Sequence, residues 1–214
     1  FAASIDLARA GFRATPLVRV YAPGGKLPAR AVDLRDVDRR PTVLTMRSSI
    51  EQVFAAAGAC LNDRLTLLES PIIARHAWSH GGVLDLYPDA QRSRQSIEDF
   101  AGADDAVGFE RFYSHSARIH QTLSETFMTA SKPDPVTLVG RVLRRHHPSS
   151  LMAAKPAPNL WRALGDFFSD ERLRQLFARY ATYVGSSPLS TPATLMLIAH
   201  VELEGLCLVE WRMP

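Results

Sequence analysis

Cysteines are scarce in this sequence, and they form no recognisable motif. Cys60 and Cys207 are the two cysteines among 214 residues, and no CxxC pair is present. A disulfide framework is therefore not indicated, and reduced thiols in the cytoplasm are expected. The first residues also lack the pattern of a signal peptide. These features argue against a secreted, disulfide-stapled domain.

Motifs for several common chemistries are missing as well. The net charge is only +3, and no nucleic-acid-binding motif accompanies the basic residues, so no nucleic-acid partner is expected. His115 and His120 lie five positions apart on a predicted helix, which does not place both rings on one face, so no metal site is expected. The segment Gly185–Pro188 is not the G-x-S-x-G elbow of hydrolases, and no catalytic triad can be assigned.

Charge is absent from the stretch Tyr180–Val201, which contains no Asp, Glu, Lys or Arg. The Ser-Pro and Thr-Pro pairs within it predict a helix, a tight turn and a second helix. We expect Thr191 to cap the second helix, with Pro192 as its first residue and Gly205 as its end. That helix is apolar on nearly every side, which predicts burial in a core. About 13 residues span roughly 20 Å, too short to cross a bilayer.

The N-terminal part has the pattern of a nucleotide-binding unit. We expect a helix over Phe1–Gly11 and a short strand over Phe12–Val20, although Pro16 favours an irregular path there. A turn with Gly24, Gly25 and Lys26 follows. Helix, strand and Gly-Gly-Lys turn form the second half of a dinucleotide-binding βαβ unit. The G-x-G-x-x-G loop of its first half is not in the sequence and would precede Phe1, so a fragment is expected.

The remaining pattern predicts an α+β fold. It comprises a partial dinucleotide-binding, Rossmann-type domain over residues 1–60 and a mainly helical domain with a small antiparallel sheet over residues 61–214. The family resemblance described below implies that the first is a partial FAD-binding domain and the second a substrate-binding domain. A charged surface strand and turn is expected over residues 29–40, and a buried strand or loop over Pro41–Met46. Further strands are expected over Leu65–Leu68, Ile72–Trp78 and Val83–Tyr87, the last two joined as a hairpin. The helices expected are Ser49–Gly58, one around Ile97–Phe100, Asp104–Met128, Val136–Arg145, Asn159–Phe168 and Asp170–Val184.

Several segments resemble a known family. In the first 60 residues, IDLARAGFRAT, APGGKL, PTVLTMR and FAAAG resemble the FAD-dependent carotenoid desaturases of the phytoene desaturase family. The distal segment LWRALGDFFSDERLRQLFARYATYVGSSPLSTPATLMLIAHVE resembles more narrowly the bacterial desaturases of hydroxyneurosporene and methoxyneurosporene. The resemblance covers most of the chain.

This resemblance implies an enzyme that binds FAD and removes two hydrogens across a C–C bond of an acyclic carotenoid. Hydride passes to the flavin, and a neighbouring carbon loses a proton; no catalytic residue is identified. The residues that match flavin-binding positions of the family are Arg19, Gly24, Gly25, Lys26, Pro41, Thr42 and Thr45.

The same resemblance implies a long apolar tunnel and access to the membrane in which the substrate dissolves. The candidates for the tunnel are Tyr180, Tyr183, Ser186, Pro188 and Met196. We therefore expect a cytoplasmic protein bound peripherally to the membrane surface. The basic clusters at Arg35–Arg40 and Arg141–Arg145 are either solvated faces or contacts for phosphate or anionic lipid.

The sequence also departs from the family pattern. Val18 replaces the glutamate that binds the adenosine ribose, and Arg40 replaces a glycine next to the flavin. After Val209, a family Gly-Gly-Met is Glu-Trp-Arg-Met. We therefore expect this chain alone to hold FAD poorly and to be inactive.

Two alternatives remain open at this stage. The first is another enzyme of the same superfamily, a phytoene desaturase or a carotenoid isomerase. The second is a non-catalytic module that binds an apolar ligand or the membrane without flavin. The distal segment YATYVGSSP favours the hydroxy- or methoxy-carotenoid desaturase.

Overall fold

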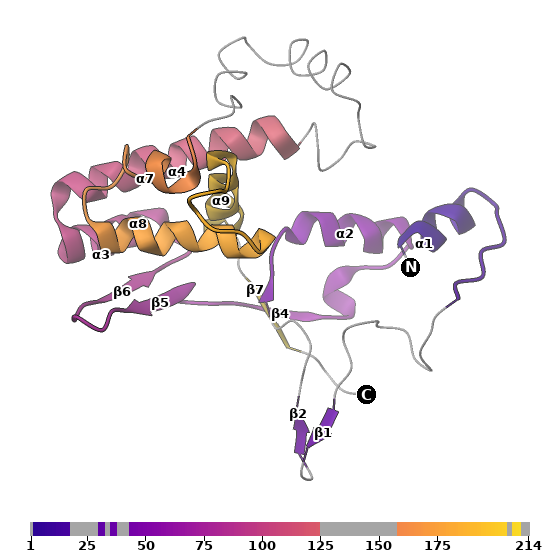
Figure 1. Ribbon diagram of the computed structural model, residues 1–214. Helices are drawn as coiled ribbons and strands as arrows, with labels where there is room; N and C mark the ends of the chain where they lie inside the picture. Colours follow the sequence, from indigo (N-terminus) through magenta and orange to yellow (C-terminus); the bar gives the residue numbers. More distant parts are fainter. Residues whose placement is uncertain are drawn as a thin grey trace. The chain divides into compact units, whose positions relative to one another are not determined.

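The computed structural model describes residues 2–17, 30–32, 35–37, 43–124, 158–204 and 207–210 (Figure 1). The chain divides into two compact units, and each is described by itself. Unit 1 comprises Phe1–Ser70 and Gly205–Pro214, and unit 2 comprises Pro71–Glu204. The division into functional domains at residue 60 stays a prediction.

Unit 1 begins with helix α1, Ala2–Arg9, as predicted. The helix ends at Arg9, and Gly11 follows with φ of +85°, in the region that favours glycine. The predicted strand over Phe12–Val20 is wrong for residues 12–17, which form no strand. Pro16 explains the irregular path, because proline lacks the N–H group that a sheet ladder requires.

A three-stranded antiparallel sheet joins distant parts of unit 1. Its strands are β3 (Val43–Leu44), β7 (Cys207–Glu210) and β4 (Thr66–Glu69), in the order β3-β7-β4. The central strand β7 thus follows its neighbour β4 by more than a hundred residues along the chain. A separate hairpin pairs β1 (Arg30–Val32) with β2 (Arg35–Val37), in agreement with the predicted charged strand.

Helix α2 follows β3 directly and runs over Arg47–Ala56. Its residues Ile50, Val53 and Phe54 are half-buried, as their helical spacing predicts. The 3₁₀ turn η1 (Leu61–Asp63) then leads to β4, and Leu61 is buried.

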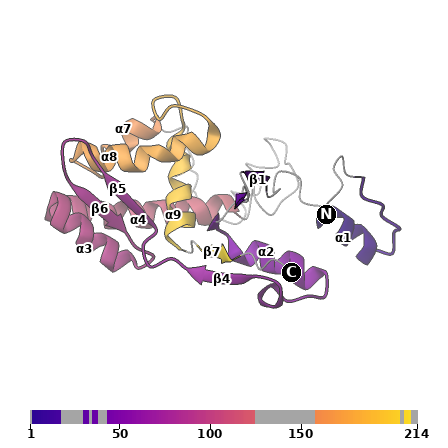
Figure 2. The same cartoon turned by 90° about the horizontal axis from the view of Figure 1, so that it is seen from below.

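Unit 2 opens with the predicted hairpin. Strands β5 (Ala74–Ala77) and β6 (Val83–Leu86) pair antiparallel, and Gly81 and Gly82 in the turn both have φ of +95°. Only glycine adopts this backbone conformation without strain. Leu84 and Leu86 are buried, and β6 lies against α3 (Figure 2).

Two helices follow the hairpin. Helix α3 (Ala90–Ala101) is capped by the Asp89 side chain, and α4 (Ala103–Leu123) confirms the long helix predicted from residue 104. The predicted inward residues Phe109, Phe112 and Ile119 are buried. The rest of that prediction, like the helix over 136–145, lies outside the described residues.

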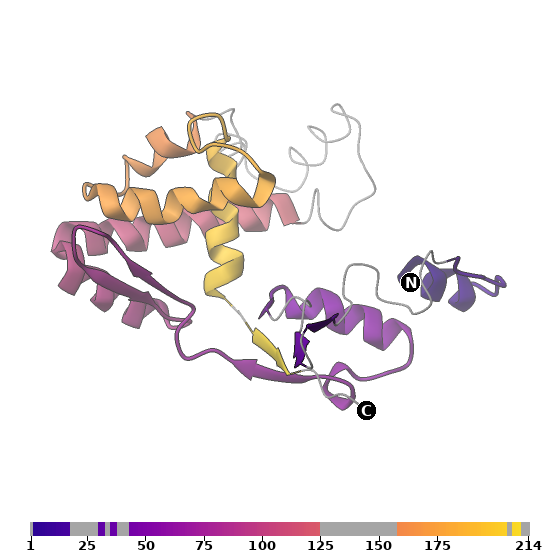
Figure 3. The same ribbon diagram turned by 60° about the horizontal axis from the view of Figure 1, so that its bottom comes forward.

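The last helices are shorter than predicted. They are α7 (Leu160–Leu164), α8 (Glu171–Ala178) with its 3₁₀ extension η3 (Arg179–Val184), η4 (Ala193–Met196) and α9 (Leu197–Leu203). Helix α9 crosses α4 and α8 steeply (Figure 3). The prediction that Thr191 is the N-cap is wrong, because extended Pro192 holds that position. The Thr191 hydroxyl donates to the Ser187 carbonyl oxygen instead.

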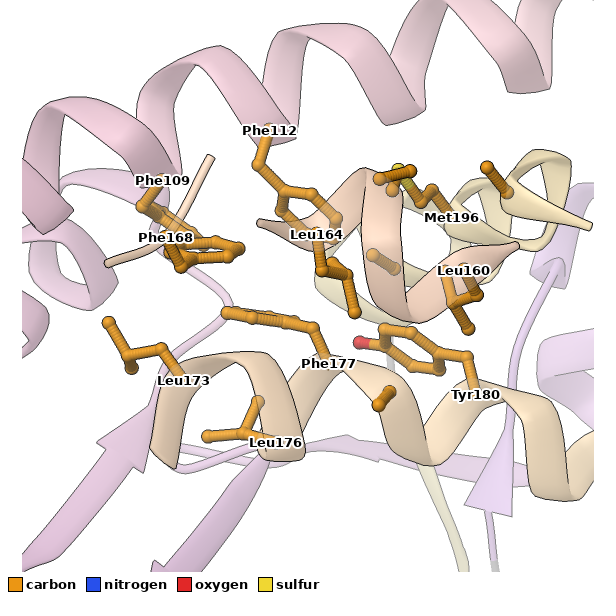
Figure 4. Packing of buried hydrophobic residues seen from close by; sticks show 14 of the residues in the cluster. Phe109, Phe112, Leu160, Leu164, Phe168, Leu173, Leu176, Phe177, Tyr180 and Met196 are labelled. Atoms are coloured by element: carbon orange, nitrogen blue, oxygen red, sulfur yellow. The ribbon is translucent and has the colours of Figure 1, made fainter. Parts of the chain in front are cut away.

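Aromatic rings form the centre of unit 2 (Figure 4). Phe112 and Phe177 have ring centroids 4.6 Å apart, and Phe168 stacks on Phe177 at 4.9 Å. Tyr180 and Met196 are fully buried in the same cluster. The structure as described is mainly helical with small antiparallel sheets, which confirms the α+β class.

Candidate functional site

In unit 1, the candidate site is the turn from β3 to α2. Thr45 is half-buried there, and Met46 follows with φ 54° and ψ 46°. Among the described residues, Met46 is the only non-glycine with positive φ. A left-handed methionine is unusual, and such strain concentrates at functional sites.

Helix α2 begins immediately after this turn, and no side chain caps its N-terminus. The first N–H groups of a helix lack intrahelical partners and attract electron-rich groups. Arg47 holds the helix start in place, because its guanidinium donates to Glu51 at 2.7 Å and to Asn62 at 3.1 Å. Glu51, by hydrogen bond and charge, raises the pKa of Arg47.

Of the predicted flavin-binding residues, Thr45 is the one whose placement the structure describes. The others lie outside the described residues; they are Arg19, Gly24, Gly25, Lys26, Pro41 and Thr42. Their roles stay predictions.

The predicted tunnel residues of unit 2 separate into buried and accessible ones. Tyr180 and Met196 belong to the packed core (Figure 4). Tyr183 is 64% exposed, whereas Ser186 and Pro188 are half-buried in the turn. The rings of Tyr180 and Tyr183 are 6.2 Å apart, so these two residues connect core and surface.

Backbone hydrogen bonds hold the turn between η3 and η4 against α7. Trp161 N–H donates to the Pro188 carbonyl at 3.2 Å, and Leu160 N–H donates to Thr191 at 2.8 Å. Ser186 N–H donates back to the Ala181 carbonyl at 3.1 Å. The turn is therefore fixed at both ends, although its side chains Val184 and Leu189 are largely exposed.

A buried polar cluster of Arg179, Tyr180 and Glu202 fixes η3 on α9. The Glu202 carboxylate accepts two hydrogen bonds from the Arg179 guanidinium, at 3.1 and 2.6 Å, and one from the Tyr180 hydroxyl at 2.6 Å. Burial and then the Glu202 charge raise the pKa of Tyr180 well above its usual value. The phenol therefore stays protonated and serves as a donor.

His76 on β5 lies in the electrostatic field of this cluster. Burial and then the charge of Arg179 lower the pKa of His76, so the ring is neutral near pH 7. Its Nε2 atom and Nε of Arg179 are buried without a hydrogen-bond partner among the described residues.

A second histidine pair lies between α4 and α9. The rings of His120 and His200 are 4.8 Å apart, and Nε2 of His200 is 3.2 Å from the Glu204 carboxylate. Burial lowers the pKa of His200, Glu204 offsets part of this effect, and His120 adds to it. No three His, Cys, Asp or Glu side chains within the described ranges are grouped to hold a metal ion.

Sequence reasoning missed two buried carboxylates. Neither Glu202 nor Asp105 belongs to a motif that the sequence pattern indicates. Asp105 is 3% exposed and accepts from Ser169 N–H and hydroxyl, both at 2.7 Å, and from Asp170 N–H at 3.2 Å. No signal in the sequence distinguishes them, because Asp104 lies next to Asp105 and Glu204 lies two residues after Glu202.

No helix in the part of the chain that the structure describes is long and apolar enough to span a membrane. This agrees with the prediction for the stretch Tyr180–Val201, which is divided into η3, a turn, η4 and α9.

The comparisons with known proteins identify carotenoid-metabolising oxidoreductases as homologues of this chain. No family model matches the sequence. A phytoene dehydrogenase of Streptomyces griseus is 33% identical over 201 residues, which are 94% of this chain and 39% of that protein.

Higher identity is found to hydroxyneurosporene desaturases. The protein of Rubrivivax gelatinosus is 42% identical over 208 residues, 97% of this chain and 39% of the relative. That of Cereibacter sphaeroides is 40% identical over 212 residues, 99% of this chain and 42% of the relative. The chain thus spans about two fifths of the length of the curated relatives it matches.

Proposed function

We propose that this chain is part of an FAD-dependent desaturase that acts in carotenoid biosynthesis. Its substrate would be an acyclic hydroxy- or methoxy-carotenoid of the neurosporene type. The observation that carries the proposal is an identity of 40–42% to two hydroxyneurosporene desaturases over nearly the whole chain, so both units contribute to the match.

Unit 1 would be part of the FAD-binding domain. The turn from β3 to α2 supports this assignment, because the strained Met46 and the uncapped helix start present backbone N–H groups next to Thr45. The residues that would hold the cofactor are Thr45 and, by resemblance, Arg19, Gly24, Gly25, Lys26, Pro41 and Thr42. When bound, FAD supplies the hydride acceptor, and the protein supplies position and exclusion of water.

Unit 2 would bind the carotenoid. Carotenoids are long apolar molecules, and the turn from η3 to η4 exposes Tyr183 (64%), Val184 (57%) and Leu189 (62%) beside the aromatic core. A group of exposed apolar side chains on a fixed turn is suited to a ligand or a membrane surface. We infer that this turn is where substrate enters from the membrane, to which the protein binds peripherally on the cytoplasmic side.

A phytoene desaturase is the second candidate. The 33% identity to the Streptomyces griseus phytoene dehydrogenase supports it, but less strongly than the identities of 40% and above support the first.

Expression of the whole gene that contains this coding segment, rather than of the 214 residues alone, in carotenoid-producing cells tests the proposal. In cells that accumulate hydroxyneurosporene, we expect a product lacking two hydrogens, with absorption at longer wavelength. Parallel cells that accumulate phytoene or neurosporene are the controls. Conversion of phytoene alone would favour the second candidate, and an unchanged pigment profile in all three strains would contradict both.

A further inference from the structure

A groove of about 630 Å³ lies along the outer face of α4, away from the residues discussed above. Its lining is Glu110, Arg111, Ser114, Arg118 and Phe167. Arg111, Ser114 and Arg118 follow one another at intervals of three and four positions, so they share one face of the helix. All three are exposed.

The two arginines of this groove have no carboxylate partner within ion-pair distance among the described residues. Arg111 donates only to the backbone carbonyl of Asp166, at 3.4 Å. In contrast, Arg75, Arg94, Arg172 and Arg179 of the same unit are each paired with an acid. The donors of Arg111 and Arg118 are therefore available to a ligand.

Two acids lie close to the groove. Glu110 is paired with Arg94 at 2.6 Å, and Arg94 is also paired with Glu98 at 2.6 Å. Asp166 is exposed and contributes its backbone carbonyl to Arg111. The Glu110 carboxylate thus binds Arg94, which it shares with Glu98, rather than Arg111 or Arg118, so both guanidinium groups of the groove stay without a carboxylate partner among the described residues.

We propose that this groove binds a phosphate group, carried either by a free phosphate compound or by the headgroup of an anionic lipid. Guanidinium groups bind phosphate oxygens through paired, charge-assisted hydrogen bonds. The Ser114 hydroxyl lies between the two arginines on the helix face and adds a further donor. Phe167 adds an apolar residue to the lining of the groove.

His115 offers an internal reporter of binding. Its ring lies 5.5 Å from that of Phe167, and burial and then the charge of Arg118 lower its pKa. An anion beside Arg118 offsets that charge, so the pKa of His115 rises on binding. By linkage, the anion binds more tightly at a pH where His115 is protonated.

The test uses the full 214-residue chain and two phosphate sources. Inorganic phosphate is titrated while the pKa of His115 is followed by NMR at constant ionic strength. In parallel, sedimentation is measured with vesicles of phosphatidylcholine, with and without phosphatidylglycerol. The variants are Arg111→Gln and Arg118→Gln, and the matched control is Arg162→Gln, which removes an exposed arginine on α7 outside the groove.

Each result decides the proposal. A rise in the pKa of His115 with inorganic phosphate, weakened about tenfold by either groove variant but not by Arg162→Gln, supports a site for free phosphate. Sedimentation that requires phosphatidylglycerol and shows the same variant pattern supports a lipid headgroup. The proposal is overturned if neither ligand has an effect, or if Arg162→Gln weakens binding as much as the groove variants do.

Discussion

At the residue scale, Glu202 illustrates how a buried charge depends on its partners. The carboxylate is 6% exposed and accepts three hydrogen bonds from Arg179 and Tyr180. A buried ion pair contributes little net stability over apolar packing, but removal of one partner leaves the other charge buried and unpaired.

We therefore predict that Glu202→Gln lowers the free energy of unfolding by about 3 kcal/mol. Urea unfolding followed by tryptophan fluorescence measures this change. Glu171→Gln, at an exposed position in the first turn of α8, is the control and should change stability by less than about 0.5 kcal/mol. A loss no larger than the control's would mean that Arg179 remains solvated without Glu202.

The buried histidines predict how stability depends on pH. Burial lowers the pKa of His76 and of His200 below the usual 6.5, so the unfolded chain binds more protons than the folded chain below that value. The contribution of the two neutral histidines to the free energy of unfolding is therefore fully present above pH 6.5. It is lost as the pH falls toward their lowered pKa values in the folded chain. His200→Gln should make this decline shallower below pH 6.5.

Urea midpoints at a series of pH values measure this effect. His80→Gln, at an exposed position of the hairpin turn, is the control and should leave the slope of the wild type unchanged. If the urea midpoint fell equally steeply with decreasing pH in His200→Gln and in the wild type, another group would cause the decline.

At the element scale, the close approach of α4 to the segment after α7 depends on one glycine. A Cβ atom at Gly108 would lie 1.9 Å from the Phe167 backbone carbonyl oxygen, which cannot move without displacing the chain. Gly108 is within α4 and has ordinary helical backbone, so alanine there is unfavourable for steric reasons alone.

Gly108→Ala should therefore destabilise unit 2 by about 3 kcal/mol, although alanine is the better helix former. Thermal unfolding measures the loss. Val107→Ala, at the adjacent and half-exposed position, is the matched control and should have a small effect. A stabilised Gly108→Ala variant would show that α4 and the Phe167 backbone are further apart in solution.

At the scale of the whole molecule, the flavin content of the purified chain tests whether it binds FAD as the family it resembles does. By resemblance, Val18 stands where the family has a ribose-binding glutamate, and valine accepts no hydrogen bond from a hydroxyl group. We predict that the purified 214-residue chain carries well below one flavin per chain. Flavin absorbance of the purified chain measures the content, and Val18→Glu should raise it. Stoichiometric flavin in the wild type would contradict the prediction.

The parts of the fold that sequence predicted are those that depend on neighbouring residues. The spacing of Phe109, Phe112 and Ile119 is sufficient to orient α4, and Gly81 and Gly82 are sufficient to place the hairpin turn. The geometry of the candidate site at the turn from β3 to α2 could not be predicted in this way. The strain at Met46 left no signal in composition or periodicity, because it arises where β3 meets α2.

The sequence alone determined two features of this protein: its resemblance to carotenoid desaturases and the division of the charge-free stretch Tyr180–Val201. Both depend on local patterns, namely motifs and Ser-Pro turns. Only the tertiary structure decided that Glu202 meets Arg179 and Tyr180, and that β7 pairs between β3 and β4. The physical reason is that a buried charge or a strand edge is satisfied by groups far away in the chain, and composition or spacing does not identify those groups.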